Sequence, residues 1–259
     1  MKPNTPHRVY TIKSAICHGG HFYCMSTIRE STYGILHHFA ASSFLTNTQH
    51  TADSRLLLRR IVVYIHYIFV RRQFDTRQPT MPTPHVPNVS TFEGTIDLFM
   101  ICVIMELGNL LNPQAYRRGT HPERQCDPIA TLYSRGLARD IMDWWHAHYE
   151  LVSEDGTRCT GWELFDKLFS HQARVLAIYR RVSEERGIFT DEHECTAAEF
   201  ETWLTRYHGK RLGFRGPVAN WVSQHKQDQG WKSASFAWPG PTYSVKARTT
   251  PMPHKASKP

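Results

Sequence analysis

Paired cysteines are missing from this sequence. Its six cysteines are scattered along 259 residues without a C-x-x-C motif, and the first residues lack the apolar core of a secretory signal peptide. Disulfide frameworks are typical of secreted domains, whereas intracellular proteins keep their thiols reduced. We therefore expect free thiols and an intracellular location, nuclear or cytoplasmic.

A hydrophobic run long enough to cross a membrane is also missing. The one candidate extends from Leu56 to Val70, and Arg59, Arg60 and His66 interrupt it. Its uninterrupted apolar part is shorter than the roughly 20 residues that a bilayer requires. Because this segment is apolar nearly all round, we expect a helix buried between other elements and no membrane contact.

Motifs of nucleotide-binding and hydrolytic enzymes are absent as well. The sequence contains no phosphate-binding P-loop, no G-x-G-x-x-G and no G-x-S-x-G. It also offers no nucleophile with a general base at a recognisable spacing. These enzyme classes therefore have no support in the sequence.

The chain does contain enough apolar material for a core. Hydrophobic residues make up 41% of it and aromatic residues 12%, which excludes wholesale disorder. The net charge of +8 is uneven, because the part from Arg206 onward carries +9 and the first 205 residues carry −1. The body is thus nearly neutral and the C-terminal part is basic.

Most of the chain has the apolar periodicity of helices. Three capping boxes, in which a hydroxyl residue precedes a glutamate by three positions, begin at Ser90, Thr160 and Thr196. Asp127 with Pro128 is a further helix start, and residues 154–156 predict a turn. The predicted helices cover about 26–45, 55–72, 91–111, 127–149, 161–186, 197–207 and 217–226.

The predicted fold class is mainly α, a helical array that follows two short N-terminal β-strands. The strands lie on either side of Lys13, the second of them is interrupted by Gly19 and Gly20, and we expect no partner strands elsewhere in the chain. The predicted division is 1–25 for the strands, 26–208 for the helical domain and 209–259 for a basic, largely disordered tail. A proline-rich linker at about 75–89 interrupts the helical domain.

Histidine and cysteine side chains cluster in the second N-terminal strand. Cys17, His18, His21 and Cys24 are residue types that bind zinc. Side chains alternate along a strand, so all four converge only if the Gly19–Gly20 break rotates the second half of the strand. A structural zinc site and strand residues facing a core both remain open.

Two H-x-[DE] pairs offer ligand types used by non-haem iron enzymes. They are His121 with Glu123, in a loop rich in proline and arginine, and His148 with Glu150, at a predicted helix end. Adjacent side chains splay apart at a helix end, and a pattern this short recurs by chance in a chain with 16 histidines. We interpret both pairs as solvated surface.

The sequence has seven tryptophans, which could stack on nucleobases beside the basic C-terminal part. Trp144, Trp162 and Trp203 lie in helical registers and are expected in the core. Trp231 and Trp238 lie in the tail, where they are free to stack on nucleobases. The tail is therefore predicted either to contact nucleic acid or an acidic protein, or to serve only as a solvated extension.

The opening stretch resembles the end of a Jumonji-C catalytic domain, as found in histone-lysine demethylase-like and related fungal proteins. The residues that carry the resemblance are, in order, Pro6, His7, Val9, Ala15, Gly19, Gly20, His21 and Phe22. In that family a proline–histidine step ends a strand of a double-stranded β-helix, and a glycine-rich strand and a run of helices follow it.

The resemblance implies Fe(II) and 2-oxoglutarate as cofactors, and protein hydroxylation or lysine demethylation as the family activity. It makes His7 the third iron ligand and places Gly20 and His21 at the floor of the 2-oxoglutarate pocket. The other ligands of the family lie well upstream of this histidine, and only six residues precede His7. We therefore expect no catalysis by this chain alone.

Three hypotheses result for the function. The first is a C-terminal fragment or degenerate copy of a Jumonji-C-like dioxygenase. The alternative is a helical interaction module whose basic tail contacts nucleic acid or an acidic partner. The third is a zinc-stapled domain built on the Cys17–Cys24 cluster. If the barrel is missing, an exposed sheet edge is expected to favour association.

Overall fold

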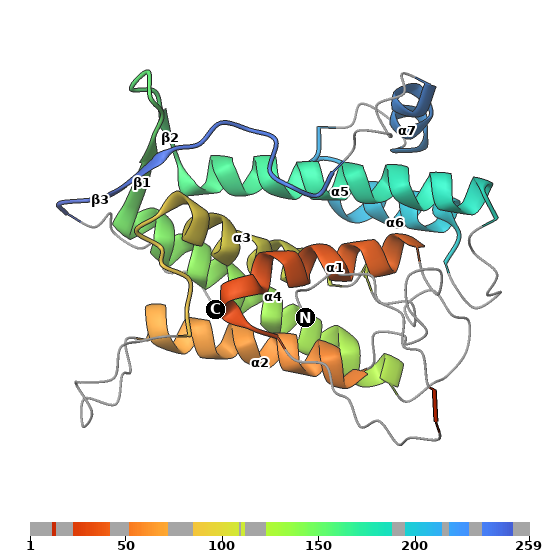
Figure 1. Ribbon diagram of the computed structural model, residues 1–259, viewed down its shortest axis with the longest axis horizontal. Helices are drawn as coiled ribbons and strands as arrows, with labels where there is room; N and C mark the ends of the chain where they lie inside the picture. Colours follow the sequence, from red (N-terminus) through yellow and green to blue (C-terminus); the bar gives the residue numbers. More distant parts are fainter. Residues whose placement is uncertain are drawn as a thin grey trace.

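A computed structural model describes residues 12–13, 23–41, 52–71, 85–108, 110–111, 123–187, 195–213, 218–227 and 235–250. Over these ranges the chain forms mainly helices with a small sheet at one end, so the predicted fold class is confirmed (Figure 1). The helices are η1 (Met25–Thr27), α1 (Ile28–Ala41), α2 (Ala52–Phe69), α3 (Phe92–Leu107), α4 (Glu123–His148), α5 (Gly161–Glu185), α6 (Ala197–His208) and α7 (Val218–Gln227). Of the predicted N-terminal strands only Ile12 and Tyr23 are described, and neither is in a strand; the other strand residues and the first ten residues of the proline-rich linker lie outside the described ranges.

Two of the three predicted capping boxes are confirmed. The Thr160 hydroxyl accepts a hydrogen bond from the Glu163 amide at 3.1 Å, and the Glu163 carboxylate accepts one from the Thr160 amide at 2.7 Å. Thr196 and Glu199 repeat this exchange at the start of α6. Each box satisfies backbone N–H groups that have no partner within the helix.

The predicted starts of α3 and α4 were each wrong. Thr91, not Ser90, caps α3, because its hydroxyl accepts from the Gly94 amide at 3.1 Å. Gly94 packs so closely on Asn88 that a Cβ would lie 2.1 Å from the Asn88 carbonyl oxygen. Helix α4 begins at Glu123, so Pro128 lies in its second turn. A proline so near the start removes only one of the first intrahelical bonds.

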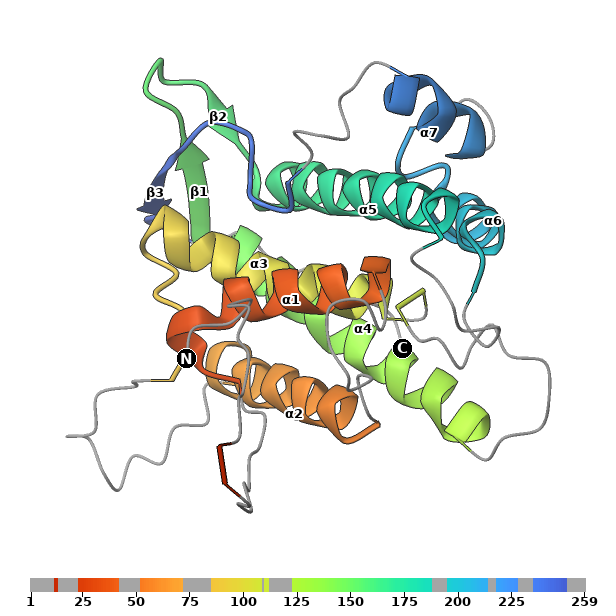
Figure 2. The ribbon, with the colours of Figure 1, turned by 45° about the vertical axis from the view of Figure 1, so that its right-hand side comes forward.

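Helix α3 forms the centre of the molecule. Thirteen of its 16 residues are buried, since α1, α4 and α5 pack around it. The two ribbon views agree on this arrangement, with α5 on one side of α3 and α2 on the other (Figures 1 and 2). A helix that is apolar all round requires such enclosure.

The sheet corrects the prediction that no strands follow the N-terminal pair. Strand β1 (Tyr149–Val152) pairs antiparallel with β2 (Arg158–Cys159) and with β3 (Ser244–Ala247), in the order β2-β1-β3. The predicted turn joins β1 to β2, and Gly156 takes a φ of 84° in it. The strands have two to four residues, and β3 pairs with β1 from a distant part of the chain, so no alternating pattern of residues marks them in the sequence.

The prediction of a largely disordered tail was wrong for residues 235–248, which we call the C-terminal strap. Phe236 is 1% exposed, with its ring 4.6 Å from that of His37 and 5.6 Å from that of Tyr179. Backbone carbonyls of the strap accept hydrogen bonds from His171 and Gln172 of α5. The strap crosses α5 and ends in β3 (Figure 1).

Candidate functional site

Most of the predicted metal and cofactor residues fall outside the part of the chain that the structure describes. These are His7, Cys17, His18, Gly20 and His21. Cys24 is described, and its exposed thiol lies 3.0 Å from the Ser26 hydroxyl. The iron remnant and the zinc cluster therefore stay predictions.

The second H-x-[DE] pair does not converge on a common point. The Nδ1 atom of His148 lies 2.7 Å from the Trp144 carbonyl oxygen, whereas Glu150 pairs with Arg158 and Arg248. Of the other pair, His121 lies outside the described residues. Among the described residues, no group of three or more histidine, cysteine, aspartate or glutamate side chains is arranged to hold a metal ion.

The tryptophans pack mainly against the core. Trp144, Trp162 and Trp203 are partly buried there, as predicted. Trp238 was predicted to be free, but it also packs against the core, and its indole N–H donates to the Pro241 carbonyl at 3.1 Å. Trp231 lies outside the described residues. The nucleobase-stacking role predicted for Trp238 is therefore not supported by its position.

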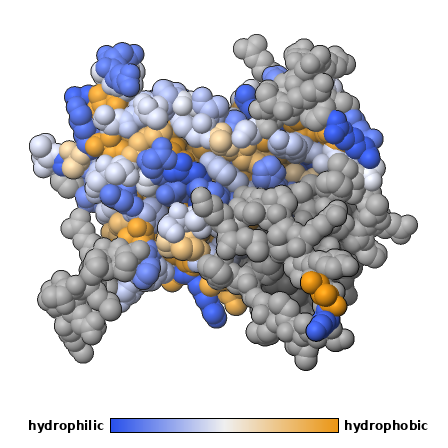
Figure 3. Space-filling view, viewed as in Figure 1, coloured by the Kyte–Doolittle hydropathy of each residue, from blue (hydrophilic) through white to orange (hydrophobic). Residues whose placement is uncertain are grey.

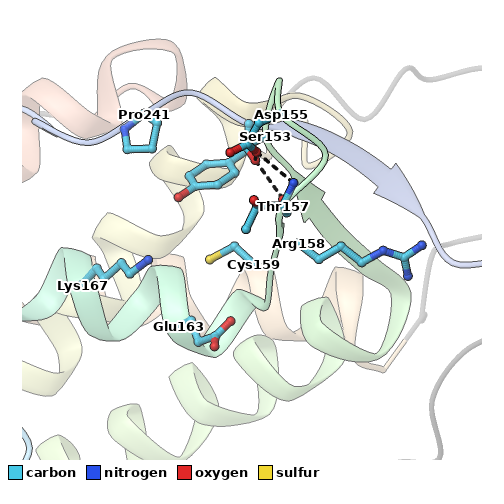
Figure 4. Close-up of a pocket in the computed structure, with 9 residues that line it drawn as sticks. Ser153, Asp155, Thr157, Arg158, Cys159, Glu163, Lys167 and Pro241 are labelled. Atoms are coloured by element: carbon cyan, nitrogen blue, oxygen red, sulfur yellow. Dashed lines mark hydrogen bonds between the residues drawn. The ribbon is translucent and has the colours of Figure 1, made fainter.

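A pocket of about 310 Å³ lies where the β1–β2 hairpin, the first turns of α5 and the strap meet (Figure 4). The hairpin and β2 contribute five of its lining residues, α5 contributes two, and the strap contributes Pro241 and Tyr243. Figure 4 shows Lys167 reaching from α5 toward Cys159, while Arg158 points away. The pocket thus joins three segments that are far apart in the sequence.

Both acids of this pocket are engaged by their own turns. Asp155 accepts from the Ser153 hydroxyl and from the Thr157 amide, and these bonds lower the pKa of its carboxyl. Glu163 accepts the Thr160 amide in the capping box, which likewise lowers the pKa of Glu163. Lys167 forms no direct ion pair with a described residue, but its positive charge contributes to lowering the pKa of Glu163.

The thiol of Cys159 is not an activated nucleophile. Burial raises its pKa, and the positive charge of Lys167 and a hydrogen bond with Tyr243 only partly offset that effect. A reactive cysteine needs a lowered pKa, because the thiolate is the attacking species. The pocket is therefore suited to reversible binding, not to covalent catalysis.

A second polar cluster lies inside the helical array, around Glu106 of α3. Its side chain is 1% exposed and receives hydrogen bonds from Arg135 at 2.9 Å and from Arg139 at 2.8 Å. Arg211 lies 3.7 Å away and also contacts Asp166 of α5. Burial alone would raise the pKa of Glu106, but the three arginines lower it below its ordinary value. The cluster ties α3, α4, α5 and the end of α6 together.

His208 lies at the same cluster and is 6% exposed. Burial lowers its pKa to about 4, and the positive charges of Arg135, Arg211 and Arg139 act in the same direction, against the attraction of Glu106. His208 is therefore neutral in the folded protein at pH 7. Its ring packs edge-on against Phe169, with a centroid distance of 4.9 Å.

This depressed pKa predicts a loss of stability in mild acid. The unfolded chain takes up the proton near pH 6.5 and the folded chain only near pH 4, so stability falls as pH drops through that interval. Between pH 7 and pH 5, we expect His208 to lower the free energy of unfolding by about 2 kcal/mol. The measurement is urea unfolding of the wild type and of His208→Gln at both pH values, with exposed His225→Gln as control. Equal pH dependence in all three proteins would contradict the prediction.

An exposed apolar face runs along α2, which corrects the prediction that this helix is buried all round. Leu58, Val62, Ile65 and Ile68 are buried on one face. The opposite face, together with Arg71 just after the helix, is called the α2 surface and consists of exposed residues: Leu56, Leu57, Arg60, Val63, Tyr64, Tyr67 and Arg71. Figure 3 shows hydrophobic and hydrophilic side chains next to one another along the visible part of α2. The helix lies at the edge of the array, where no described element covers its second face.

Helix α4 also has exposed apolar residues. It packs beside α2 through the stacked rings of Phe69 and Trp144 and through His66, whose Nε2 atom lies 3.2 Å from Asp140. On α4, Leu132 is 61% exposed and Tyr133 is 62% exposed. None of the helices in the described part of the chain is both long and apolar enough to cross a membrane.

No protein-family model, curated protein or solved structure shows a significant match to this chain. The function must therefore be inferred from the chemistry of the surface and of the pocket.

Neither the α2 surface nor the pocket was identified from the sequence, for different reasons. The α2 surface had a signal, because residues 56, 57, 60, 63, 64 and 67 share one face at helical spacing. The pocket had none, since Cys159, Lys167 and Tyr243 come together only when the strap folds back over α5. Such a grouping cannot be found from spacing along the chain.

Proposed function

We propose that this chain is a helical interaction module that binds an acidic amphipathic helix of a partner protein through the α2 surface. One observation carries the proposal. Nine large hydrophobic residues of the described chain are exposed; five of them lie on α2 and two more on α4. Clustering of this kind marks interaction sites, whereas single exposed apolar residues are ordinary.

The composition of the surface favours a protein partner over a lipid bilayer. Tyrosine and arginine are enriched at protein interfaces and lysine is depleted there. The α2 surface contains Tyr64, Tyr67, Arg60 and Arg71 and no lysine. Tyr64 and Tyr67 are 46% and 47% exposed, so about half of each side chain is covered by its neighbours. Such rings form a shallow surface on which an opposing helix can pack; they do not protrude as a membrane anchor would.

The charge of the surface favours an acidic partner. Between Arg55 and Arg71 the sequence contains Arg59, Arg60 and His66 and no acidic residue. Glutamates flanking the leucine face of a partner helix can therefore pair with Arg60 and Arg71, and the one acid of α2, Asp53, lies in its first turn. A second copy of the same face would instead place arginines near arginines.

The proposal is tested with a synthetic amphipathic helix that has leucines on one face and glutamates beside them. Tyr67→Asp is expected to weaken binding at least tenfold, because it puts a carboxylate into the apolar contact. Tyr207→Asp is the matched control, since Tyr207 is 48% exposed on α6, and its binding is expected to change less than about twofold. Isothermal titration calorimetry measures both.

Two further measurements test the charge and the class of partner. Arg60→Gln is expected to weaken binding of the glutamate peptide and to reduce its salt dependence, while leaving a glutamine-substituted peptide unaffected. Absence of peptide binding, or equal effects of Tyr67→Asp and Tyr207→Asp, would overturn the proposal. Binding to anionic vesicles that depends on Tyr67 would replace the protein partner by a lipid surface.

A further inference from the structure

We infer that the pocket between the hairpin, α5 and the strap binds a small aromatic carboxylate, held by Lys167 and Tyr243. This site is separate from the α2 surface and does not depend on the interaction proposed there. The inference rests on the geometry of the pocket and on the directions in which the charged side chains of its lining point.

Lys167 is the positive group that a ligand in the pocket can reach. The lining holds two acids, Asp155 and Glu163, and each accepts a backbone hydrogen bond from its own turn. Arg158 is 76% exposed, points away from the pocket and lies 3.4 Å from Glu150. The side chain of Lys167 reaches toward the pocket from α5. Lys167 is therefore the group that can pair with an anionic ligand.

The hydroxyl of Tyr243 provides a second contact. The Tyr243 phenol lines the pocket. A phenolic hydroxyl donates one hydrogen bond, and a carboxylate oxygen is a strong acceptor for it.

The remaining lining favours a flat apolar group beside the carboxylate. The ring of Pro241 lines the pocket together with the ring of Tyr243, which also packs against Phe92 at 5.6 Å. Offset packing of aromatic rings is favourable at such separations. A volume of about 310 Å³ is within the range of small-molecule sites and accommodates a single ring with its carboxylate.

The test uses benzoate, with benzamide as a neutral molecule of the same shape and inorganic phosphate as a different anion. Amide NMR signals of the full-length protein are followed during titration at pH 7. Benzoate is expected to bind with a dissociation constant of about 1 mM and to shift signals of residues 153–167 and 241–243. Benzamide is expected to bind at least about tenfold more weakly, because it cannot form the charge-assisted contact with Lys167.

Two variants and one control localise the effect. Lys167→Met is expected to weaken benzoate binding about tenfold, and Tyr243→Phe about threefold, without unfolding the protein. Lys246→Met removes an equal charge from exposed β3 outside the pocket and is expected to leave binding unchanged. No shifts with benzoate, or equal effects of Lys167→Met and Lys246→Met, would overturn the inference. Binding of phosphate without benzoate would overturn the assignment of a carboxylate.

Discussion

Replacing Glu106 by alanine is expected to lower the free energy of unfolding by about 3–5 kcal/mol, the largest effect of any single substitution that we predict. Glu106 is 1% exposed and lies within 2.9 Å of Arg135 and Arg139. Without its carboxylate, their guanidinium groups and that of Arg211 lose the central negative charge of the cluster. The positive charge that then remains uncompensated in this partly buried site accounts for the expected loss of stability.

The matched control is Asp166→Ala. Asp166 also pairs with Arg211, at 2.6 Å, but its side chain is 51% exposed. Water can replace an exposed carboxylate, so we expect a loss below about 1 kcal/mol. Urea unfolding at pH 7 measures both variants. Similar losses in the two would show that burial of Glu106 does not set the energy of the cluster.

Replacing Phe236 by alanine is expected to lower the free energy of unfolding by about 3 kcal/mol. The Phe236 ring is 1% exposed and contacts the rings of His37 on α1 and Tyr179 on α5. Its removal leaves a cavity and forfeits the burial of a large aromatic side chain. It also loosens the strap that supplies β3 to the edge of β1.

Tyr207→Ala serves as the control, because it removes an aromatic ring that is 48% exposed on α6. We expect a change within about 0.5 kcal/mol. Hydrogen exchange provides a local readout. Glu150 and Lys246 face each other across β1 and β3, two positions from the bond that the Arg248 amide donates to the His148 carbonyl, so their amides are expected to exchange faster in Phe236→Ala than in the wild type. An unchanged stability and unchanged exchange would restore the interpretation of this segment as a disordered tail.

The helices could be predicted because their signals are local. The Thr160 and Thr196 capping boxes each need only four consecutive residues, and the bonds they form connect groups three positions apart. The start of α3 was wrong by one residue because Asn88, which precedes the helix, packs on Gly94 and selects Thr91 as the cap. The predicted cap was therefore one residue from the observed cap, which is less than one helical turn.

The candidate sites were harder to predict because their members come from separate elements. The α2 surface follows a helical spacing, but whether that face is covered depends on which helices lie beside it. Lys167 and Tyr243 are unremarkable in sequence, and only the strap brings Tyr243 to the start of α5. The Jumonji-C resemblance of the first 25 residues stays a prediction, since its key residues lie outside the described ranges.

The sequence by itself determined the mainly helical class and most helix boundaries, because apolar periodicity and caps act over a few residues. Only the tertiary structure decided the sheet, the docking of the strap, the burial of Glu106 and the exposure of the α2 surface. The physical reason is that strand pairing and burial of a side chain are set by neighbours from distant parts of the chain. Leu151 pairs with Val245, and Glu106 is held by arginines of α4 and by Arg211.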